Sequence, residues 1–141
     1  MYKIEIITIG KNKKNWLDCA LEEYQKRLSH NFSFNWVFAK DNHQLTRFCL
    51  QKKPYIALDP NGIVLDSPKF AKKWFSLLES YGSRLTLVIG GAEGLDSLIK
   101  QNADALISFS ALTFTHQICR LILLEQIYRS DQIIKNTAYH K

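Results

Sequence analysis

Apolar residues in the first third of the chain follow two periods, one of a strand and one of a helix. Residues 2–9 form a short β-branched run that is typical of a buried strand. A helix is expected to begin behind Asn15 as its N-cap, because the apolar residues that follow are spaced for one helical face: Leu17, Leu21, Tyr24 and Leu28. Aromatic residues alternate over residues 32–38, which predicts a half-buried strand.

The middle of the chain continues this alternation of elements. A second helix is predicted after Asp41-Asn42, from its apolar residues Leu45, Phe48 and Cys49. Residues 55–58 read as a strand, which Asp59-Pro60-Asn61-Gly62 is expected to end as a turn. Ser67-Pro68 is expected to open a third helix as a cap followed by proline, and Gly82 is expected to stop it.

The last part of the chain adds two strands and two helices. Residues 85–89 are almost continuously apolar, as in a strand buried on both faces of a parallel sheet. A glycine-rich turn and a short helix with Leu95, Leu98 and Ile99 lead to a strand over 105–109. The final helix is predicted over 115–134, with 135–141 left as a tail.

Strands that alternate with helices predict an α/β fold with a largely parallel sheet, in a single domain covering residues 1–141. The final helix is apolar on nearly all sides, through Ile118, Leu121, Ile122, Leu123, Leu124, Ile127 and Tyr128. An amphipathic surface helix buries only one stripe, so this helix needs a second apolar partner. That partner is either the same helix of another subunit, which would make a homodimer, or the rest of its own chain.

Charge and cysteine content narrow the cellular setting. Nineteen basic and 13 acidic residues give a net charge of +6, which favours a polyanionic partner without proving one. Cys19, Cys49 and Cys119 lack the spacing of a metal or redox motif, and each is expected to be a buried, reduced thiol. No apolar run is long enough to cross a bilayer and no secretory signal is recognisable, so no membrane partner is expected and the predicted location is the cytoplasm.

The most conspicuous candidate site follows the strand at 85–89. Gly90-Gly91-Ala92-Glu93-Gly94 lies at a carboxyl strand end, the edge at which open α/β sheets bind ligands. Glycines there allow a ligand close to the backbone, although a tight turn alone would also need them. The spacing matches neither the dinucleotide motif nor the P-loop.

A second candidate loop and the chain terminus carry further polar groups. Residues 110–115, Ser-Ala-Leu-Thr-Phe-Thr, are expected at the same sheet edge, where hydroxyls and backbone can bind an adenine or ribose or simply cap the last helix. The terminal Tyr139-His140-Lys141 suits stacking on a base and contact with phosphate, but from composition alone it can equally be a frayed end. His116 and Cys119 alone make no metal site, and no metal is expected.

Several of these segments, taken in order, resemble the bacterial ribosomal RNA large-subunit methyltransferase H family. The likeness spans the chain and is carried by Leu58-Asp59 with Gly62, residues 89–95 (IGGAEGL), residues 109–116 (FSALTFTH), Arg120, residues 124–129 (LEQIYR), and the ending Tyr139-His140-Lys141. The resemblance implies a SPOUT-type α/β fold with a C-terminal trefoil knot, a feature that periodicity alone would not predict.

The resemblance also implies an activity. The family transfers a methyl group from S-adenosylmethionine to N3 of a pseudouridine in large-subunit (23S) ribosomal RNA, within the assembled ribosome and as a homodimer. By position, the cofactor-binding residues it implies are Leu58, Gly90, Gly91, Ser110, Ala111, Leu112, Thr113, Phe114 and Thr115. The sequence departs from the common family pattern at four positions. Thr115 and Ala138 stand where proline is frequent, Phe114 where leucine is usual and Lys141 where arginine is frequent. These changes affect local geometry and not the resemblance to the family.

The chemistry asks for alignment and for loss of the N3 proton. Holding a nucleophile against an electrophilic methyl group can supply roughly 7–11 kcal/mol. The candidate catalytic residues are His140 or Tyr139 as the proton acceptor, with Arg129 or Lys141 stabilising charge or gripping phosphate. The alternative to an enzyme is a non-catalytic RNA- or nucleotide-binding factor associated with the ribosome.

Overall fold

In the computed structural model, which describes residues 1–140, the chain alternates strictly between strands and helices. Lys141, to which the sequence assigns a charge-stabilising role, lies outside the described residues. The elements are β1 (Tyr2–Ile9), α1 (Asn15–Leu28), β2 (Phe32–Ala39), α2 (Asn42–Gln51), β3 (Tyr55–Val64), α3 (Ser67–Ser80), β4 (Arg84–Ile89), α4 (Ser97–Asn102), β5 (Ala105–Ser108) and α5 (His116–Ile134).

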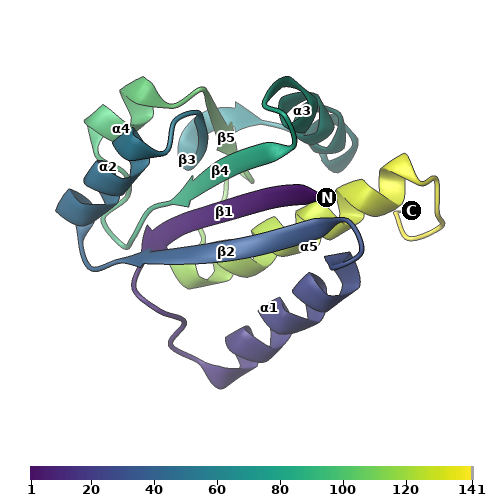
Figure 1. Ribbon diagram of the computed structural model, residues 1–141. Coiled ribbons are helices and arrows are strands. Elements are labelled where there is room, and N and C mark those ends of the chain that lie inside the picture. The colour runs from purple at the N-terminus through teal and green to yellow at the C-terminus, as the bar shows by residue number, and fades with distance from the viewer. Residues whose placement is uncertain (141) are drawn as a thin grey trace.

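Across residues 1–140 the strands form one five-stranded sheet in the order β2-β1-β4-β3-β5, and every neighbouring pair is parallel. Helices α1, α3 and α5 cover one face, and α2 and α4 cover the other (Figure 1). The predicted α/β class with a parallel sheet flanked by helices is therefore confirmed. The C-terminal knot stays a prediction.

Each face of the sheet has its own core. The larger core joins Ile4 and Ile6 of β1 to Leu17, Trp74 and Leu123 of the three covering helices. The smaller core joins the opposite faces of β1, β3 and β4 to α2 and α4. Successive strand residues point to opposite faces, so Ile6 and Ile7 serve different cores.

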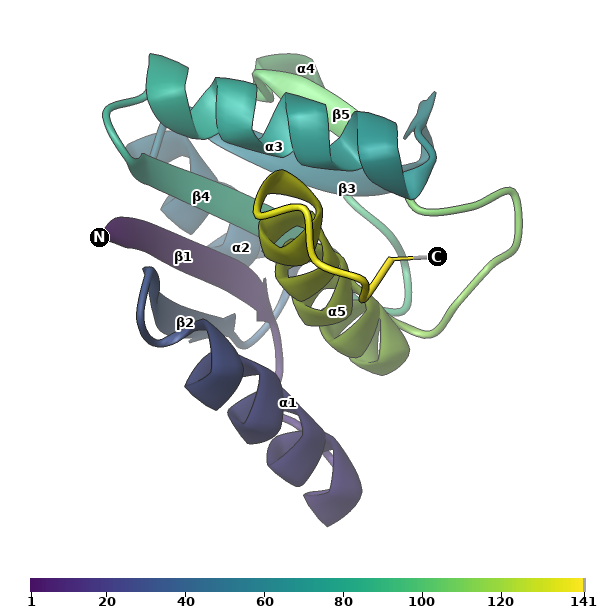
Figure 2. The ribbon, with the colours of Figure 1, turned by 90° about the vertical axis from the view of Figure 1, so that its right-hand side faces the viewer.

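Helix α5 lies between α1 and α3 over the middle of the sheet (Figure 2). Its own chain therefore buries Leu123, Leu124 and Ile127 completely. Much of the apolar surface of α5 is therefore buried by the rest of its own chain, which was the second alternative to a partner subunit. Ile118, Leu121 and Ile122 remain only half-buried.

One strand boundary was predicted wrongly. Asp59-Pro60-Asn61-Gly62 does not end β3 as a turn, because the strand continues to Val64 and pairs again with β5 after a shift of register between Leu58 and Ile63. Proline lacks a donor and glycine lacks a side chain, so both are tolerated at such an irregularity. Gly62 also lies against β5, where an added Cβ would be 2.7 Å from backbone atoms of Ile107.

Helix starts were predicted in position but not always in detail. The N-cap of α1 is Lys14 rather than Asn15, and the N-cap of α3 is Asp66, whose side chain accepts from Lys69 N, rather than Ser67. Asp66 takes this role because Ser67 and Pro68 already occupy the first helical positions. Thr115 caps α5 as expected, and its hydroxyl oxygen accepts from Ile118 N at 3.2 Å.

The cysteines divide by exposure. All three are free thiols, as expected, and Cys49 is buried, but Cys119 is half-buried and Cys19 is exposed. Cys19 was expected to be buried; it is exposed because it lies on the solvent side of α1, away from Leu17 and Leu21. Within residues 1–140 no helix is long and apolar enough to cross a membrane.

Candidate functional site

A cavity of about 180 Å³ lies at the carboxyl ends of β3, β4 and β5, where the sequence places both candidate loops. The glycine-rich turn and the loop before α5 both contribute to its lining. The lining residues are Leu58, Asp59, Pro60, Ile89, Gly90, Gly91, Ala92, Gly94, Leu95, Ile107, Ser108, Phe109, Ser110, Leu112, Thr113, Phe114, His116 and Cys119.

The glycine-rich turn is tight as well as part of the cavity wall. Gly94 has a φ of +79° and its N–H donates to Gly91 O at 3.0 Å. A Cβ on Gly90 would be 3.0 Å from the carbonyl carbon of Gly94 and 3.1 Å from a methyl carbon of Leu95. The glycines are therefore needed for a tight turn, and the same turn borders a cavity that could hold a ligand, so the two interpretations of the motif are compatible.

The loop between β5 and α5 is organised by its own serines. Ser108 donates its hydroxyl to Ser110 O at 2.9 Å, and Leu112 N donates to Ser110 Oγ at 3.0 Å. Of the cofactor-binding residues that the sequence suggests, Leu58, Gly90, Gly91, Ser110, Leu112, Thr113 and Phe114 line the cavity. Ala111 and Thr115 do not line it; the Thr115 side chain instead caps α5.

The sequence did not single out several residues of this cavity. Asp59 and Pro60 were assigned to a turn, and Ile107 was only part of the strand predicted over 105–109. His116 was considered only as a metal ligand, yet its ring borders the cavity, and burial, then Arg120 and Lys13, lower its pKa. Its position directly after the Thr115 cap was the available signal, since the first turn of a helix faces the loop before it.

Residues 135–140 of the C-terminal tail are held against α5 rather than frayed. Asn136, with a φ of +56°, turns the chain back along the helix after Ile134. The ring of Tyr139 then lies 4.9 Å from the guanidinium of Arg129 and edge-on to Tyr128 at 4.9 Å. These contacts offset the entropy of ordering the tail.

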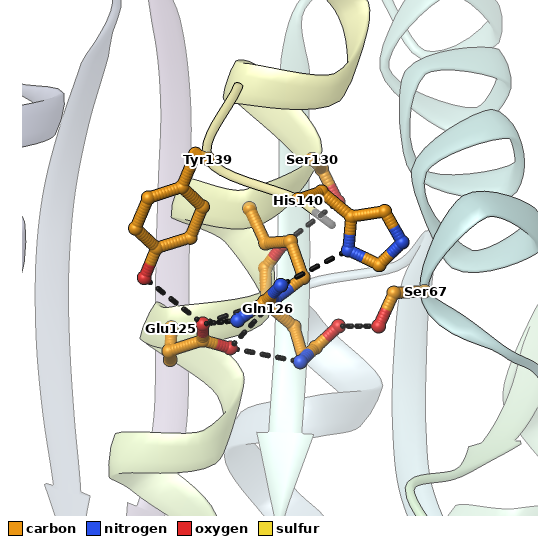
Figure 3. A network of polar contacts seen from close by, with 7 residues as sticks. Ser67, Glu125, Gln126, Ser130, Tyr139 and His140 are labelled. Carbon is orange, nitrogen blue, oxygen red and sulfur yellow. Dashed lines mark hydrogen bonds and ion pairs between the residues drawn. The ribbon is translucent and has the colours of Figure 1, made fainter. Parts of the chain in front are cut away.

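Glu125 is the centre of a polar network that joins the tail to α5 (Figure 3). Its carboxylate accepts from Arg129 Nη2 at 2.7 Å and from the Tyr139 hydroxyl at 3.2 Å. Arg129 Nη1 lies 3.0 Å from Nδ1 of His140. The structure thus brings together all three candidate catalytic residues, Arg129, Tyr139 and His140, through the carboxylate of Glu125, for which the sequence alone suggests no role.

The protonation states in this network follow from its geometry. Guanidinium groups only donate, so Nδ1 of His140 is the acceptor and its proton is on Nε2. The hydrogen bond to Glu125 raises the pKa of Arg129. Partial burial and then the Glu125 charge raise the pKa of Tyr139 to about 12, so the phenol stays protonated at neutral pH.

A groove beside His140 adjoins the cavity. It has a volume of about 480 Å³ and lies between the start of α3 and α5, with Gln126 held by the Ser67 hydroxyl at 2.8 Å. Ser108 and Phe109 line both the groove and the cavity. The carboxyl end of β5 therefore lies between the cavity, which the two candidate loops line, and the groove, which His140 borders.

Residues 1–140 contain no cluster of histidine, cysteine or carboxylate side chains that could hold a metal.

Comparison with known proteins gives a consistent family assignment. A family model described as "Predicted SPOUT methyltransferase" matches residues 2–140. A protein named ribosomal RNA large subunit methyltransferase H from Protochlamydia amoebophila is 51% identical over 141 residues, covering 100% of both chains. Proteins of the same name from Streptococcus pyogenes (35%, 99% of each chain) and Dictyoglomus thermophilum (36%, 97% of this chain and 98% of the other) are also similar. The chain belongs to the SPOUT methyltransferase family and, within it, to the ribosomal RNA large subunit methyltransferase H proteins.

Proposed function

We propose that this protein transfers a methyl group from S-adenosylmethionine to N3 of a pseudouridine in 23S ribosomal RNA, acting as a cytoplasmic homodimer on the assembled ribosome. The observation that carries the proposal is the junction at Ser108 and Phe109, which joins a loop-lined cavity to a groove bordered by His140. A donor and an acceptor held on the two sides of this junction would be close enough to react.

The cavity suits an adenosine-containing cofactor. Leu58, Leu95 and Ile107 offer apolar surface to an adenine ring. Backbone at Gly90 and Gly91 and the hydroxyls of Ser110 and Thr113 can hydrogen-bond its polar edge and a ribose. Asp59 is buried at the cavity wall; its Oδ2 accepts from Asn61 N at 3.0 Å, and its Oδ1 lies 3.9 Å from the Lys100 ammonium group.

When bound, S-adenosylmethionine supplies a methyl group that is already electrophilic. The task of the chain is therefore to align the acceptor and to favour loss of its N3 proton. His140 presents Nε2–H because Arg129 occupies Nδ1, so the ring donates a hydrogen bond to a pyrimidine carbonyl oxygen. This donor stabilises the ring anion, while Arg129, whose charge is paired with Glu125, holds the imidazole in place, and the proton leaves to solvent.

Tyr139 is assigned a positioning role. With its pKa raised to about 12, the phenol is a poor proton acceptor at neutral pH. Its hydroxyl donates to Glu125 and its ring covers Arg129, which together fix the guanidinium that holds His140. The sequence suggested His140 or Tyr139 as the acceptor of the N3 proton. In this arrangement neither side chain needs to accept it.

The homodimer is supported by apolar surface that one chain leaves partly uncovered. Ile118, Leu121 and Ile122 on α5 are half-buried, and Ile63 and Val64 at the end of β3 are 65% and 60% exposed. A symmetric partner would remove this surface from water. Light scattering across a dilution series measures the oligomeric state, and a monomer at all concentrations rules out this part of the proposal.

Labelled methyl transfer tests the activity directly. Ribosomes from a strain that lacks this protein are incubated with the purified chain and labelled S-adenosylmethionine, and the labelled nucleotide is then located. Label at N3 of one 23S pseudouridine is expected. Deleting residues 139–141 should abolish transfer while cofactor affinity, measured by calorimetry, stays within a few-fold. No cofactor binding by the intact chain would instead favour a non-catalytic RNA-binding factor.

A further inference from the structure

The segment between β1 and α1 gathers cations beside an exposed indole. Lys11, Lys13 and Lys14 are exposed, and Trp16 in the first turn of α1 is 54% exposed. Within residues 1–140 none of these three ammonium groups has an ion-pair partner. A large exposed aromatic ring next to uncompensated charge is the composition of a nucleic-acid contact.

Hydrogen bonds from helices α1 and α5 hold this segment in place. The Asn12 side chain accepts from Arg120 at 2.8 Å and donates to Asp18 at 2.8 Å. Gln117 of α5 accepts from Lys13 N at 3.2 Å and donates to Lys11 O at 3.2 Å. Only backbone atoms of the lysines are used, so their ammonium groups stay available while the loop itself is ordered.

The loop lies beside the cavity, at the same edge of the sheet. A Cβ on Gly91 would be 3.2 Å from Ile9, the last residue of β1, and His116, the neighbour of Gln117, lines the cavity. Lys13 is also close enough to contribute to the lowered pKa of His116. A polyanion that crosses this loop therefore passes the cavity mouth.

We propose that Lys11, Lys13, Lys14 and Trp16 bind single-stranded RNA next to the target nucleotide, the lysines contacting phosphates and the indole stacking on an unpaired base. The inference rests on the proposed function. N3 belongs to the pairing edge of a pyrimidine, so the target base must be unpaired to react, and an unpaired target in a single-stranded segment leaves a neighbouring base free to stack on the indole.

The binding test uses labelled oligouridine and an RNA duplex of the same length, with fluorescence anisotropy as the readout. Trp16→Ala should weaken oligouridine binding roughly 5- to 150-fold, the range for loss of one stacked base, and Trp16→Phe should weaken it less. Replacing the three lysines with alanine should reduce the salt dependence of binding, with the slope of log K against log salt falling by about 2. Duplex binding should change little with Trp16→Ala.

Lys72→Ala/Lys73→Ala is the matched control, because these exposed lysines lie on α3, on the other side of α5 from α1 (Figure 2). It should leave oligouridine affinity unchanged. In methylation of ribosomes, Trp16→Ala should raise KM for ribosomes and leave kcat and cofactor affinity close to normal.

Two results would overturn the inference. One is an unchanged KM and oligouridine affinity in Trp16→Ala, while the intact chain methylates ribosomes normally; the proposed function would then stand alone. The other is a Trp16→Ala chain that loses its dimeric state in sedimentation, which would assign the indole to a subunit interface. Oligouridine binding through Trp16 by a chain that does not methylate ribosomes would refute the proposed function and, with it, the placement next to a target nucleotide; the RNA contact of Trp16 alone would stand.

Discussion

Arg120 offers the sharpest test of how this fold is held together. It is a fully buried arginine on α5 whose guanidinium reaches the end of β1. It donates at 2.8 Å to Asn12 Oδ1, to Ile9 O and to Gly10 O. Replacing Arg120 with methionine, which fills similar space without donors, leaves these three acceptors without their partner.

The size of the effect follows from two opposing contributions. Each orphaned acceptor costs about 1–3 kcal/mol, and three of them give roughly 6 kcal/mol at the centre of that range. Burial lowers the pKa of Arg120 to about 10, a shift that corresponds to about 3 kcal/mol of charge desolvation, and this cost is relieved when the cation is removed. We therefore expect Arg120→Met to lower the free energy of unfolding by about 3 kcal/mol.

Urea denaturation followed by circular dichroism measures this value, and a fall in Tm of roughly 12 °C should accompany it. Arg120→Lys keeps a cation but cannot reach three acceptors at once, so it should also destabilise the protein. A loss below about 0.5 kcal/mol in Arg120→Met would refute the reasoning, because solvent would then be satisfying the acceptors of Ile9, Gly10 and Asn12, residues that are only partly exposed.

Three further outcomes can be checked with single substitutions or labels. Gly62→Ala should lower the free energy of unfolding by roughly 1–3 kcal/mol, since its Cβ would be 2.7 Å from the Ile107 backbone; a neutral effect in denaturation would contradict the packing. Alkylation should label Cys19 first, and Cys49, buried with its pKa raised to about 12, only after unfolding; mass spectrometry locates the adducts, and early labelling of Cys49 would show the burial to be wrong. Tyr139→Phe should slow methylation without changing the shape of the pH–rate profile between about pH 6 and 9, as the phenol stays protonated below about pH 12; a lost limb of the profile would make it a proton acceptor.

The sequence predicts the elements of this fold where packing is local and periodic. The spacing of Leu17 and Leu21 gave α1, and the continuous apolar run before Gly90 gave β4 as a strand buried on both faces. The continuation of β3 to Val64 could not be read in this way. Asp-Pro-Asn-Gly favours a turn locally, and only pairing with β5, a strand much later in the chain, keeps it extended.

The site was predictable in its loops and not in its tail network. Glycines and hydroxyls at carboxyl strand ends have a general reason to border a ligand, so residues 90–94 and 110–115 stood out. The role of Glu125 depends on Asn136 reversing the chain, which brings Tyr139 and His140 back to α5. A single asparagine after a helix does not specify that path, so composition favoured a frayed end.

Helix α5 connects every functional part of the molecule. His116 at its start borders the cavity. Arg120, one turn later, holds the lysine-rich loop between β1 and α1, and Arg129 holds the tail. At 1.5 Å per residue these three positions span about 20 Å of one helix. Because α5 is packed between α1 and α3, it moves little relative to the sheet, and the spacing between the cavity, the loop and the tail is fixed by one rigid element. A substitution that tilts α5 would therefore disturb the proposed cofactor and RNA contacts and the tail together, whereas a substitution in either loop would disturb one of them.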